Sequence, residues 1–490
     1  MTGAPESPAH GPPGSAAPAP EPPALLPLAL DVDGTFLRTD LLLECFWAGL
    51  GRAPLATLRA LRCVGDRAAL KRELATIATP RLDLLPVRAE IVALARAAQA
   101  EGREVVLASA SDARLVRGLA EAHGLSHRVF ATERENLKGP VKARALVAAY
   151  GQGGFDYAGN GPEDAHVWAA ARQAHVVGGV PGAPADSIAH PGGWRLADLA
   201  RALRPHQWVK NVLLLLPMIA AHDFALATLL PVLAGIACFS AAASSIYLVN
   251  DLLDLDSDRQ HATKRRRPFA SGAVPIGAGM TASLGLGAGA LAGALALAPG
   301  FAAVVAVYMA LSLAYSLKLK RMRWVDVTVL ATLYTLRVVA GAAAGAVAVS
   351  TAMLVFVFPV FLTLGCVKRL VELARAEGEG RLPGRGYAPS DRGDLLNVAG
   401  IGVVGALVIF ALYSVSPQGR ALYPTTWILW AAGVPLAAWL VRMVRLGWLG
   451  LMDYDPIVFA LRDKAGIGIV CFTLSLMFWA AGLWAEWFGL

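Results

Sequence analysis

The stretch that decides the fold is Asn250-Asp251-Leu252-Leu253-Asp254-Leu255-Asp256-Ser257-Asp258, which closes a long apolar run. That run, residues 229–249, is long enough to cross a bilayer as a helix. Read as a helix, the stretch places Asn250, Asp254 and Asp258 on one face. Carboxylates this close together repel one another and resist burial, and a divalent cation relieves both problems. The stretch therefore predicts a Mg²⁺ site at the end of a membrane helix, held by Asp251, Asp254 and Asp258.

A basic run follows, Lys264-Arg265-Arg266-Arg267-Pro268. Mg²⁺ usually binds through one or two carboxylates together with substrate phosphates, and guanidinium groups match phosphate oxygens. The two runs together indicate departure of a pyrophosphate group at a membrane surface. The alternative is a solvated acidic helix end with a basic anchor, and the spacing of the carboxylates favours the site.

Composition limits the class of protein. The chain has 490 residues, 56% hydrophobic and only 16% charged, which is too little charge for a soluble protein of this size. The net charge of +8 fits cytoplasmic loops and phosphate sites rather than nucleic-acid binding. The five cysteines are scattered, which predicts neither a disulfide framework nor a zinc site.

The apolar residues are concentrated after about residue 208, and the part before it has ordinary soluble composition, which predicts at least two domains. Residues 1–24 are rich in Pro, Ala and Gly and are predicted to be a disordered lead-in. Residues 25–190 are predicted to be a Rossmann-like α/β domain, because apolar strand candidates at 25–31, 105–108 and 155–159 alternate with helical stretches. Residues 191–207 are a predicted helical linker, and residues 208–490 an all-α membrane domain.

The membrane domain divides into about nine apolar spans. The predicted spans are residues 212–220, 229–249, 277–298, 301–317, 324–347, 351–367, 398–415, 425–441 and 467–487. Loops after every second span carry the Lys and Arg, which places them and the N-terminal domain in the cytoplasm. The chain is thus predicted to be a multi-pass protein of the inner (cytoplasmic) membrane with its C-terminus outside.

The remaining unusual polar residues of this domain are candidate substrate-binding residues, and the Lys and Arg among them could hold substrate phosphates. They are Asn250, Lys210, Lys264, Arg265, Arg266, Lys318, Asp326, Arg337 and Lys368. Asp326 and Arg337 fall inside a predicted span, where ionisable groups normally face a cavity or each other. Arg337 could equally be a structural partner for a helix-end carboxylate.

The quoted runs, together with Arg204-Pro-His-Gln-Trp-Val-Lys-Asn211, resemble the UbiA-type prenyltransferase superfamily, and within it decaprenyl-phosphate phosphoribosyltransferases. The resemblance covers the chain from about residue 200 to its end. It implies nine transmembrane helices around a lipid-facing cavity, with Mg²⁺ at the aspartates. It also implies a reaction in which a polyprenyl phosphate attacks 5-phosphoribosyl 1-diphosphate and pyrophosphate leaves.

Two alternatives stay open. An aromatic prenyltransferase using a polyprenyl diphosphate usually has a second Asp-x-x-x-Asp motif, but here Asp326 is followed four residues later by Leu330. A lipid carrier or transporter with a regulatory domain is the non-enzymatic alternative, and transporters usually show broken helices at mid-membrane. A homo-oligomer is compatible with either reading.

In the N-terminal domain, Asp31-Val-Asp33-Gly34-Thr35 follows a predicted strand and resembles the first motif of haloacid dehalogenase-like phosphatases. The resemblance implies that Asp31 is a nucleophile and Asp33 a general acid/base. It further implies a small helical cap between Asp40 and about Arg88.

Three further positions extend that resemblance. Ser109 and Lys142 match the positions that bind the phosphoryl group, and Asp164 matches a Mg²⁺ ligand, whereas Asn160 stands where another acid is expected. The implied activity is removal of the 5-phosphate from the lipid-linked ribose. The alternative is a degenerate domain kept for assembly or regulation.

Overall fold

The computed structural model describes residues 25–376, 380–382, 384–452 and 455–489. The described chain forms two compact units. One contains the residues up to Phe36 together with Val87–Gly192, and the other contains Leu37–Pro86 together with the chain from Gly193 onward. The predicted lead-in at 1–24 lies outside the described residues.

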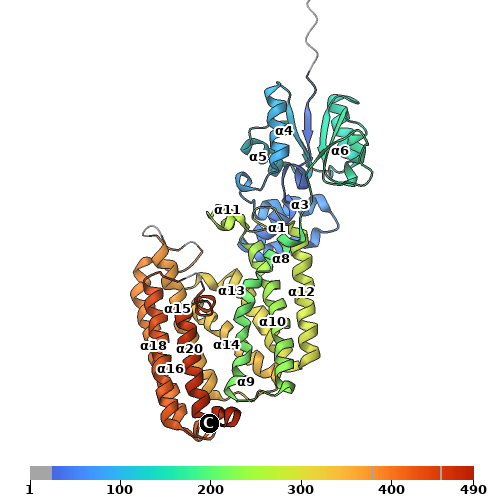
Figure 1. Cartoon of the computed structure of the whole chain (residues 1–490). Helices are drawn as coiled ribbons and strands as arrows, with labels where there is room; N and C mark the ends of the chain where they lie inside the picture. The colour runs from blue at the N-terminus through green and yellow to red at the C-terminus, as the bar shows by residue number, and fades with distance from the viewer. Residues whose placement is uncertain (1–24, 377–379, 383, 453–454, 490) are drawn as a thin grey trace, which may run out of the picture. The chain divides into compact units, whose positions relative to one another are not determined.

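The N-terminal unit is built on a six-stranded sheet with strand order β3-β2-β1-β4-β5-β6 (Figure 1). All its strand pairs are parallel, which confirms the predicted parallel α/β architecture. The strands are β1 Leu28–Leu30, β2 Val105–Asp112, β3 Val129–Thr132, β4 Asp156–Gly159, β5 Gln173–Val177 and β6 Ile188–His190. The helices between them are α4 Ala89–Ala100, α5 Ala113–Ala122, α6 Pro140–Tyr150 and α7 Ala165–Trp168.

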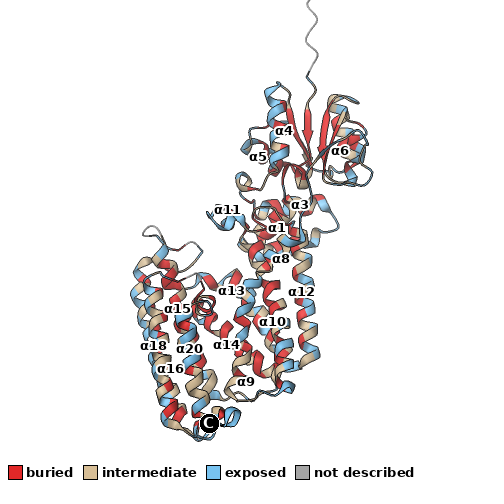
Figure 2. Cartoon of the chain, viewed as in Figure 1, coloured by how far each residue is buried: buried red, intermediate tan, exposed pale blue. Residues whose placement is uncertain are grey.

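Strand β1 lies at the point where the strand order reverses. Leu28 pairs with Val105 of β2 on one side and with Asp156 of β4 on the other. Its three residues are fully buried, as the red strands of Figure 2 show. Loops at the carboxyl ends of strands around such a reversal are where ligands bind in open parallel sheets. Of the predicted site residues, Asp31 and Asp164 follow β1 and β4, and Ser109 lies in the second half of β2.

The second unit is helical. Its described residues include seven helices that are long and apolar enough to cross a membrane. They are α10 Leu226–Leu253, α12 Ile276–Leu297, α13 Pro299–Leu317, α14 Val325–Gly345, α15 Thr351–Arg375, α16 Arg392–Val415 and α18 Thr426–Trp448.

The predicted count of nine spans is not confirmed. The first predicted span, residues 212–220, is not one helix. It consists of the end of a 3₁₀ helix, Pro205–Leu215, and of the five-residue α9, Leu216–Ala220. Pro217 lies at the start of α9 and favours this break because proline cannot donate to a preceding helical turn. The last predicted span is α20, Lys464–Ala480, which is short for a span, followed by α21, Leu483–Phe488.

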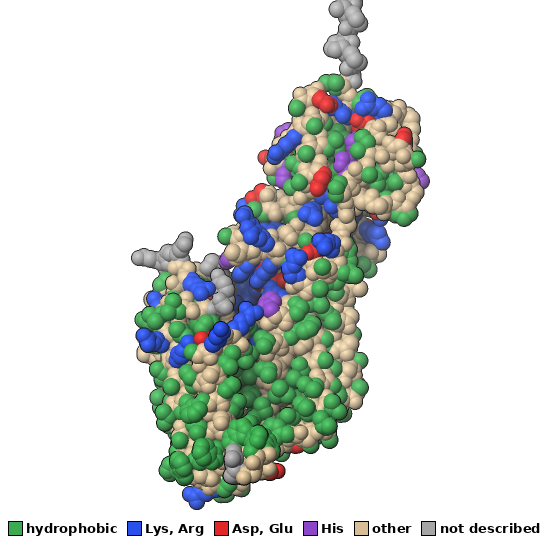
Figure 3. Space-filling model, viewed as in Figure 1, with side chains coloured by type: hydrophobic (Ala, Val, Ile, Leu, Met, Phe, Trp, Pro, Cys, Tyr) green, Lys and Arg blue, Asp and Glu red, His purple; other side chains and the backbone are tan. Residues whose placement is uncertain are grey.

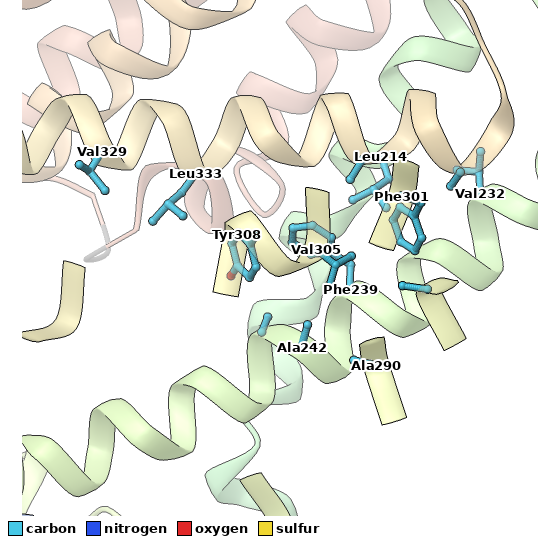
Figure 4. Close-up of a cluster of buried hydrophobic side chains, with 14 residues drawn as sticks. Leu214, Val232, Phe239, Ala242, Ala290, Phe301, Val305, Tyr308, Val329 and Leu333 are labelled. Atoms are coloured by element: carbon cyan, nitrogen blue, oxygen red, sulfur yellow. The ribbon is translucent and has the colours of Figure 1, made fainter. Parts of the chain in front are cut away.

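Small residues bring the helices of this unit close together. Figure 4 shows Ala242 of α10 and Ala290 of α12 beside larger side chains such as Phe301. At Gly341 of α14, an added Cβ would lie 1.9 Å from the carbonyl oxygen of Leu214. Small residues at such crossings let backbones touch. This contact fixes the 3₁₀ helix that carries Lys210 and Asn211.

Residues 37–86 form helices, as predicted for the insert, and pack within the helical unit. They comprise α1 Leu41–Arg52, α2 Pro54–Ala60, a 3₁₀ turn Leu61–Cys63 and α3 Arg67–Ile77. Asp40 caps α1 by accepting the backbone N–H of Leu43 at 3.0 Å. Apolar side chains of α1, including Trp47, share a cluster with Leu252 of α10 and Ile276 of α12. Within the predicted linker, α8 spans Leu196–Ala202.

Candidate functional sites

The Asp-rich stretch forms the end of α10 and the short helix α11, Leu255–Gln260. Asp251 and Asp258 are each 2% exposed. One guanidinium nitrogen of Arg267, Nη1, lies 3.1 Å from Asp251 Oδ1 and 2.7 Å from Asp258 Oδ2. Two carboxylates predicted to be metal ligands therefore converge on one cationic atom.

Two further cations complete the charge balance at this end. Arg204 donates to Asp251, and Lys320 Nζ lies 2.8 Å from Asp254 Oδ1. Arg204 has a left-handed backbone with φ of 54°, a conformation that is uncommon outside glycine and that clusters at binding sites. Burial raises the pKa of Asp258, and Arg267 opposes that rise.

Within the part of the chain that the structure describes, no three His, Cys, Asp or Glu side chains group so as to hold a metal ion. The oxygen donors at Arg267 nevertheless match what Mg²⁺ requires when substrate phosphates supply the rest of its ligands. Asp251 and Asp258 would hold such an ion in the place of the Arg267 nitrogen. The carboxylate oxygens of these two residues are ligands of the kind that Mg²⁺ prefers. The third predicted ligand, Asp254, instead accepts a hydrogen bond from Lys320.

The predicted phosphate ligands fall into three groups. Lys264, Arg265 and Arg266 form an exposed 3₁₀ turn directly before Arg267. On the visible face of the helical unit, Lys and Arg side chains gather around a hollow at its upper end (Figure 3). Asn250 is half-buried near the end of α10, and Lys318 follows the last residue of α13.

Lys210 and Lys368 form the second group, because both pair with Asp455. Lys210 donates to Asp455 Oδ2, and Lys368 Nζ lies 3.7 Å from the same oxygen. Burial opposes ionisation of Asp455, but the two lysines outweigh it and lower the pKa of this carboxyl. Arg337 lies on the adjacent helix α14 and donates to Asn211 Oδ1 at 3.1 Å and to Tyr308 Oη at 3.1 Å.

Asp326 belongs to a third group that is fully enclosed. It is 0% exposed and accepts Arg369 Nη2 at 3.0 Å and Tyr315 Oη at 2.8 Å. Arg369 is also 0% exposed and donates to Glu372 as well. A carboxylate enclosed by a guanidinium and a phenol is a structural ion pair in this arrangement. Asp326 and Arg337 thus contact different partners rather than each other.

In the N-terminal unit the sheet brings the predicted residues together. Lys142 Nζ lies 2.7 Å from Asp31 Oδ1, and Thr35 donates to Asp31 Oδ2 at 3.0 Å. Ser109 donates to Asp33 Oδ2 at 3.2 Å, and Ser111 donates to the same oxygen at 2.7 Å. Burial raises the pKa of Asp31 to about 7, although Lys142 acts in the opposite direction.

Asp164 is held by protein donors on both oxygens. Tyr157 Oη donates to Oδ1 at 2.7 Å, while the backbone N–H groups of Asn160 and Gly161 both donate to Oδ2 at 3.1 Å. The Asn160 side chain accepts Thr35 Oγ1 at 3.1 Å. Asp31 and Asp164 remain linked through Lys142, which lies 3.4 Å from Asp164 Oδ1.

Sequence reasoning missed most of the partners of these carboxylates. Arg204 and Arg267 lie inside the quoted basic runs but are not among the predicted site residues. The prediction names Lys318, whereas Lys320 is the residue that contacts Asp254. Asp455 directly precedes Pro456 at the start of α19, Pro456–Ala460, where its side chain accepts the N–H of Ile457 at 3.2 Å. An Asp-Pro pair at a helix start was the signal that could have found it.

The fold and this site define a helical protein with long apolar helices, a carboxylate-rich helix end and clustered cations. Residues 212–459 match the UbiA prenyltransferase family, and the chain belongs to that family. The family assignment and the apolar helices make the protein a multi-pass membrane protein of a transferase family.

Three similar proteins extend the comparison. An uncharacterized protein of Sinorhizobium fredii, y4nM, is 34% identical over 90% of this chain and 88% of its own. The decaprenyl-phosphate phosphoribosyltransferase of Mycobacterium tuberculosis is 32% identical over 40% of this chain and 66% of its own. The structure of a UbiA homolog from Archaeoglobus fulgidus bound to GPP and Mg²⁺ covers 58% of this chain and 99% of its own, with 15% identity and a TM-score of 0.45.

Proposed function

We propose that the helical unit transfers a phosphoribosyl group from 5-phosphoribosyl 1-diphosphate to a polyprenyl phosphate and releases pyrophosphate. The observation that carries the proposal is the convergence of Asp251 and Asp258 on one cationic atom beside the exposed Lys264–Arg266 turn. This arrangement suits a diphosphate, because anionic ligands for a divalent cation stand next to donors for phosphate oxygens. The similarity to the mycobacterial phosphoribosyltransferase supports the same choice of donor.

Residues of the chain supply binding and orientation in this proposal. Lys264, Arg265 and Arg266 hold the donor phosphates, since they are exposed and adjoin the carboxylates. When bound, Mg²⁺ at Asp251 and Asp258 neutralises the charge that develops on departing pyrophosphate. A polyprenyl phosphate oxygen is already anionic and requires no strong general base.

Lys210 and Lys368 are proposed to receive the acceptor phosphate. Both point at Asp455, whose negative charge favours the ammonium forms of the buried Lys210 and the half-buried Lys368. Arg337, with neutral partners at Asn211 and Tyr308, adds a fixed positive charge nearby.

The enclosure of Asp326 favours phosphoribosyl over aromatic prenyl transfer. An aromatic prenyltransferase would need a second carboxylate pair facing its diphosphate. Here Asp326 accepts hydrogen bonds from Arg369 and Tyr315, and the residue one helical turn further along, Leu330, is a buried apolar side chain.

A second activity is proposed for the N-terminal unit, on the strength of the Asp31, Asp33 and Lys142 cluster. We infer a haloacid dehalogenase-like phosphatase that removes the 5-phosphate from the lipid-linked product. Asp31 would attack the phosphorus while Asp33 protonates the leaving oxygen of the ribose, and Ser109 and Lys142 would hold the phosphoryl group. Water would then hydrolyse the aspartyl phosphate, which releases inorganic phosphate and restores Asp31. Fusion in one chain raises the effective concentration of the product at this unit.

In the membrane, the proposal places the carboxylate-bearing helix ends and the N-terminal unit on the cytoplasmic side, because the Lys and Arg concentrate there. The C-terminal end of the chain lies at the opposite end of the helical unit from α11 (Figure 1), which puts it outside.

The test compares variants of the purified full-length chain supplied with radiolabelled 5-phosphoribosyl 1-diphosphate, Mg²⁺ and a polyprenyl phosphate. Asp251→Asn removes an anionic ligand at the diphosphate, so labelled lipid is expected to fall by at least 10²-fold, about 3 kcal/mol of barrier. Asp256→Asn is the matched control, because the Asp256 side chain faces exposed arginines of the insert, with Arg52 at 3.5 Å, and not the site at Arg267. Equal losses in both variants, or none in either, contradict the assignment of Asp251.

A further inference from the structure

A short segment of the insert exposes leucine and arginine side chains together. Leu55 is 70% exposed, Leu58 52% and Val64 67%. Arg59 and Arg62 are exposed between them. Residues 54–65 contain no Asp or Glu. We call these five side chains the Leu–Arg face.

The opposite side of the same segment holds it in place. Thr57 is fully buried and Ala60 is 6% exposed. Thr57 donates to the carbonyl of Ala53 at 3.0 Å, and a Cβ added at Gly49 of α1 would lie 2.5 Å from Thr57 Oγ1. The helix α2 is thus seated on α1 by its small residues. Its large apolar side chains point the other way, into water, where they contribute nothing to the core of the chain.

The insert is anchored at the ends of two membrane helices. A Cβ added at Gly51 would lie 3.7 Å from the carbonyl oxygen of Leu253 in α10, and one added at Gly277 in α12 would lie 3.9 Å from Leu43. A buried ion pair holds the same contact, because Glu44 accepts Arg259 at 3.0 Å and 2.6 Å.

This anchoring sets the distance of the Leu–Arg face from the bilayer. Helix α2 begins three residues after Gly51, and three residues of extended chain span at most about 10 Å. The polar headgroup layer is about 5–7 Å thick on each side of the hydrocarbon core. The end of α10 lies at that layer because its apolar run stops before Asn250. The start of α2 is therefore within reach of the headgroups.

We propose that the Leu–Arg face is a membrane-contact surface that binds anionic phospholipids. Leu55, Leu58 and Val64 would enter the boundary between headgroups and acyl chains, as the apolar side of an interfacial helix does. Arg59 and Arg62 would pair with lipid phosphates while their aliphatic stems lie along the apolar layer. The complete lack of acidic residues in the segment fits an anionic surface. This surface is independent of the proposed transferase and phosphatase reactions.

The experiment places a fluorescent probe on the Leu–Arg face of the full-length protein in nanodiscs. Cys63, Cys238 and Cys471 are replaced by Ser, and Leu58→Cys is labelled with the environment-sensitive dye NBD. The matched control is Glu73→Cys, an exposed position of α3 in the same insert. Each labelled protein is measured in phosphatidylcholine discs, in discs containing phosphatidylglycerol, and in detergent, with spin-labelled lipids as quenchers.

The proposal expects a blue shift of the probe at position 58 in discs relative to the probe at position 73, and loss of most of its emission with spin-labelled lipid. The probe at position 73 is expected to keep its emission in all three. Adding Arg59→Ala and Arg62→Ala is expected to abolish the extra shift produced by phosphatidylglycerol. Equal quenching at 58 and 73 overturns the proposal. A blue shift at position 58 that spin-labelled lipid does not quench also overturns it, because a second copy or another protein segment then covers the face.

Discussion

The ion pair between Glu44 and Arg259 offers a quantitative test of how the insert is attached to the helical unit. Glu44 is 1% exposed and Arg259 7%. Both Glu44 oxygens accept guanidinium N–H groups, Oε1 also accepts Thr39 at 2.7 Å, and Arg259 Nε donates to the carbonyl of Ala270 at 3.2 Å. The pair is closed to water and fully hydrogen-bonded. Its partners are 215 positions apart in the chain.

The perturbation is Glu44→Gln, which keeps the shape of the side chain and removes its charge. Breaking a buried pair by neutralising one partner costs about 3–5 kcal/mol, because the other charge stays buried and uncompensated. Every 1.4 kcal/mol is a factor of ten in an equilibrium constant. Local opening of α1 is therefore expected to become roughly two to three orders of magnitude more frequent.

Hydrogen–deuterium exchange of the α1 amides, residues 41–52, in nanodiscs measures this opening directly. Glu73→Gln, an exposed change on α3, is the control and should shift stability by no more than about 0.5 kcal/mol. Replacing both partners by methionine should restore protection, since apolar pairs of similar volume often replace a buried ion pair without loss. Wild-type exchange rates of the α1 amides in Glu44→Gln would refute the reasoning. Faster exchange in the Glu73→Gln control but not in Glu44→Gln would refute it as well.

Three further outcomes follow from other contacts. Arg369→Ala should lower the melting temperature of the detergent-solubilised protein, because Asp326 then keeps only the hydroxyl of Tyr315 and a longer, 3.5 Å pair with Arg385, and losing the main partner of a buried charge costs up to about 3–5 kcal/mol; an unchanged melting curve would show that these two partners or water replace Arg369. Burial lowers the pKa of His175 from 6.5 to about 4, so the histidine is neutral in the folded unit, and the unit should lose up to about 3 kcal/mol as pH falls from 6.5 toward 4. Exchange of the β5 amides, corrected for intrinsic rates, should show that loss in wild type and a smaller one in His175→Gln; equal losses would assign the pH dependence to other groups. Asp31→Asn should leave the 5-phosphate on the lipid product, whereas wild type releases inorganic phosphate; identical phosphorylated lipid from both would make the N-terminal unit structural or regulatory.

The parts of the fold set by local pattern could be predicted from the sequence. Three strands of the sheet, the parallel arrangement and the apolar helices from α10 onward follow from runs of apolar residues and their length. The first and last predicted spans could not be judged this way. Pro217 interrupts the first, and the apolar residues around Ala481 are divided between α20 and α21.

The candidate sites were predictable only as far as their spacing is local. Asp251 and Asp258 are seven residues, or about two helical turns, apart in the chain, so their approach could be foreseen although the helix is interrupted between them at Asp254. Lys320 meets Asp254 from 66 positions away, and Asp455 meets Lys210 from 245 positions away. Such pairings depend on how helices pack, and nothing in the residues near either partner encodes them.

The central claim is the identity of the transferred group. The most direct measurement is mass spectrometry of the lipid formed when the purified chain in nanodiscs receives Mg²⁺, a polyprenyl phosphate and 5-phosphoribosyl 1-diphosphate. A parallel reaction supplies a polyprenyl diphosphate and an aromatic acid. Phosphoribosyl transfer predicts a lipid that gains a phosphopentose, or a pentose after phosphate removal, with one pyrophosphate released for each lipid formed. A prenylated aromatic acid in the second reaction, with no pentose-bearing lipid in the first, would contradict it.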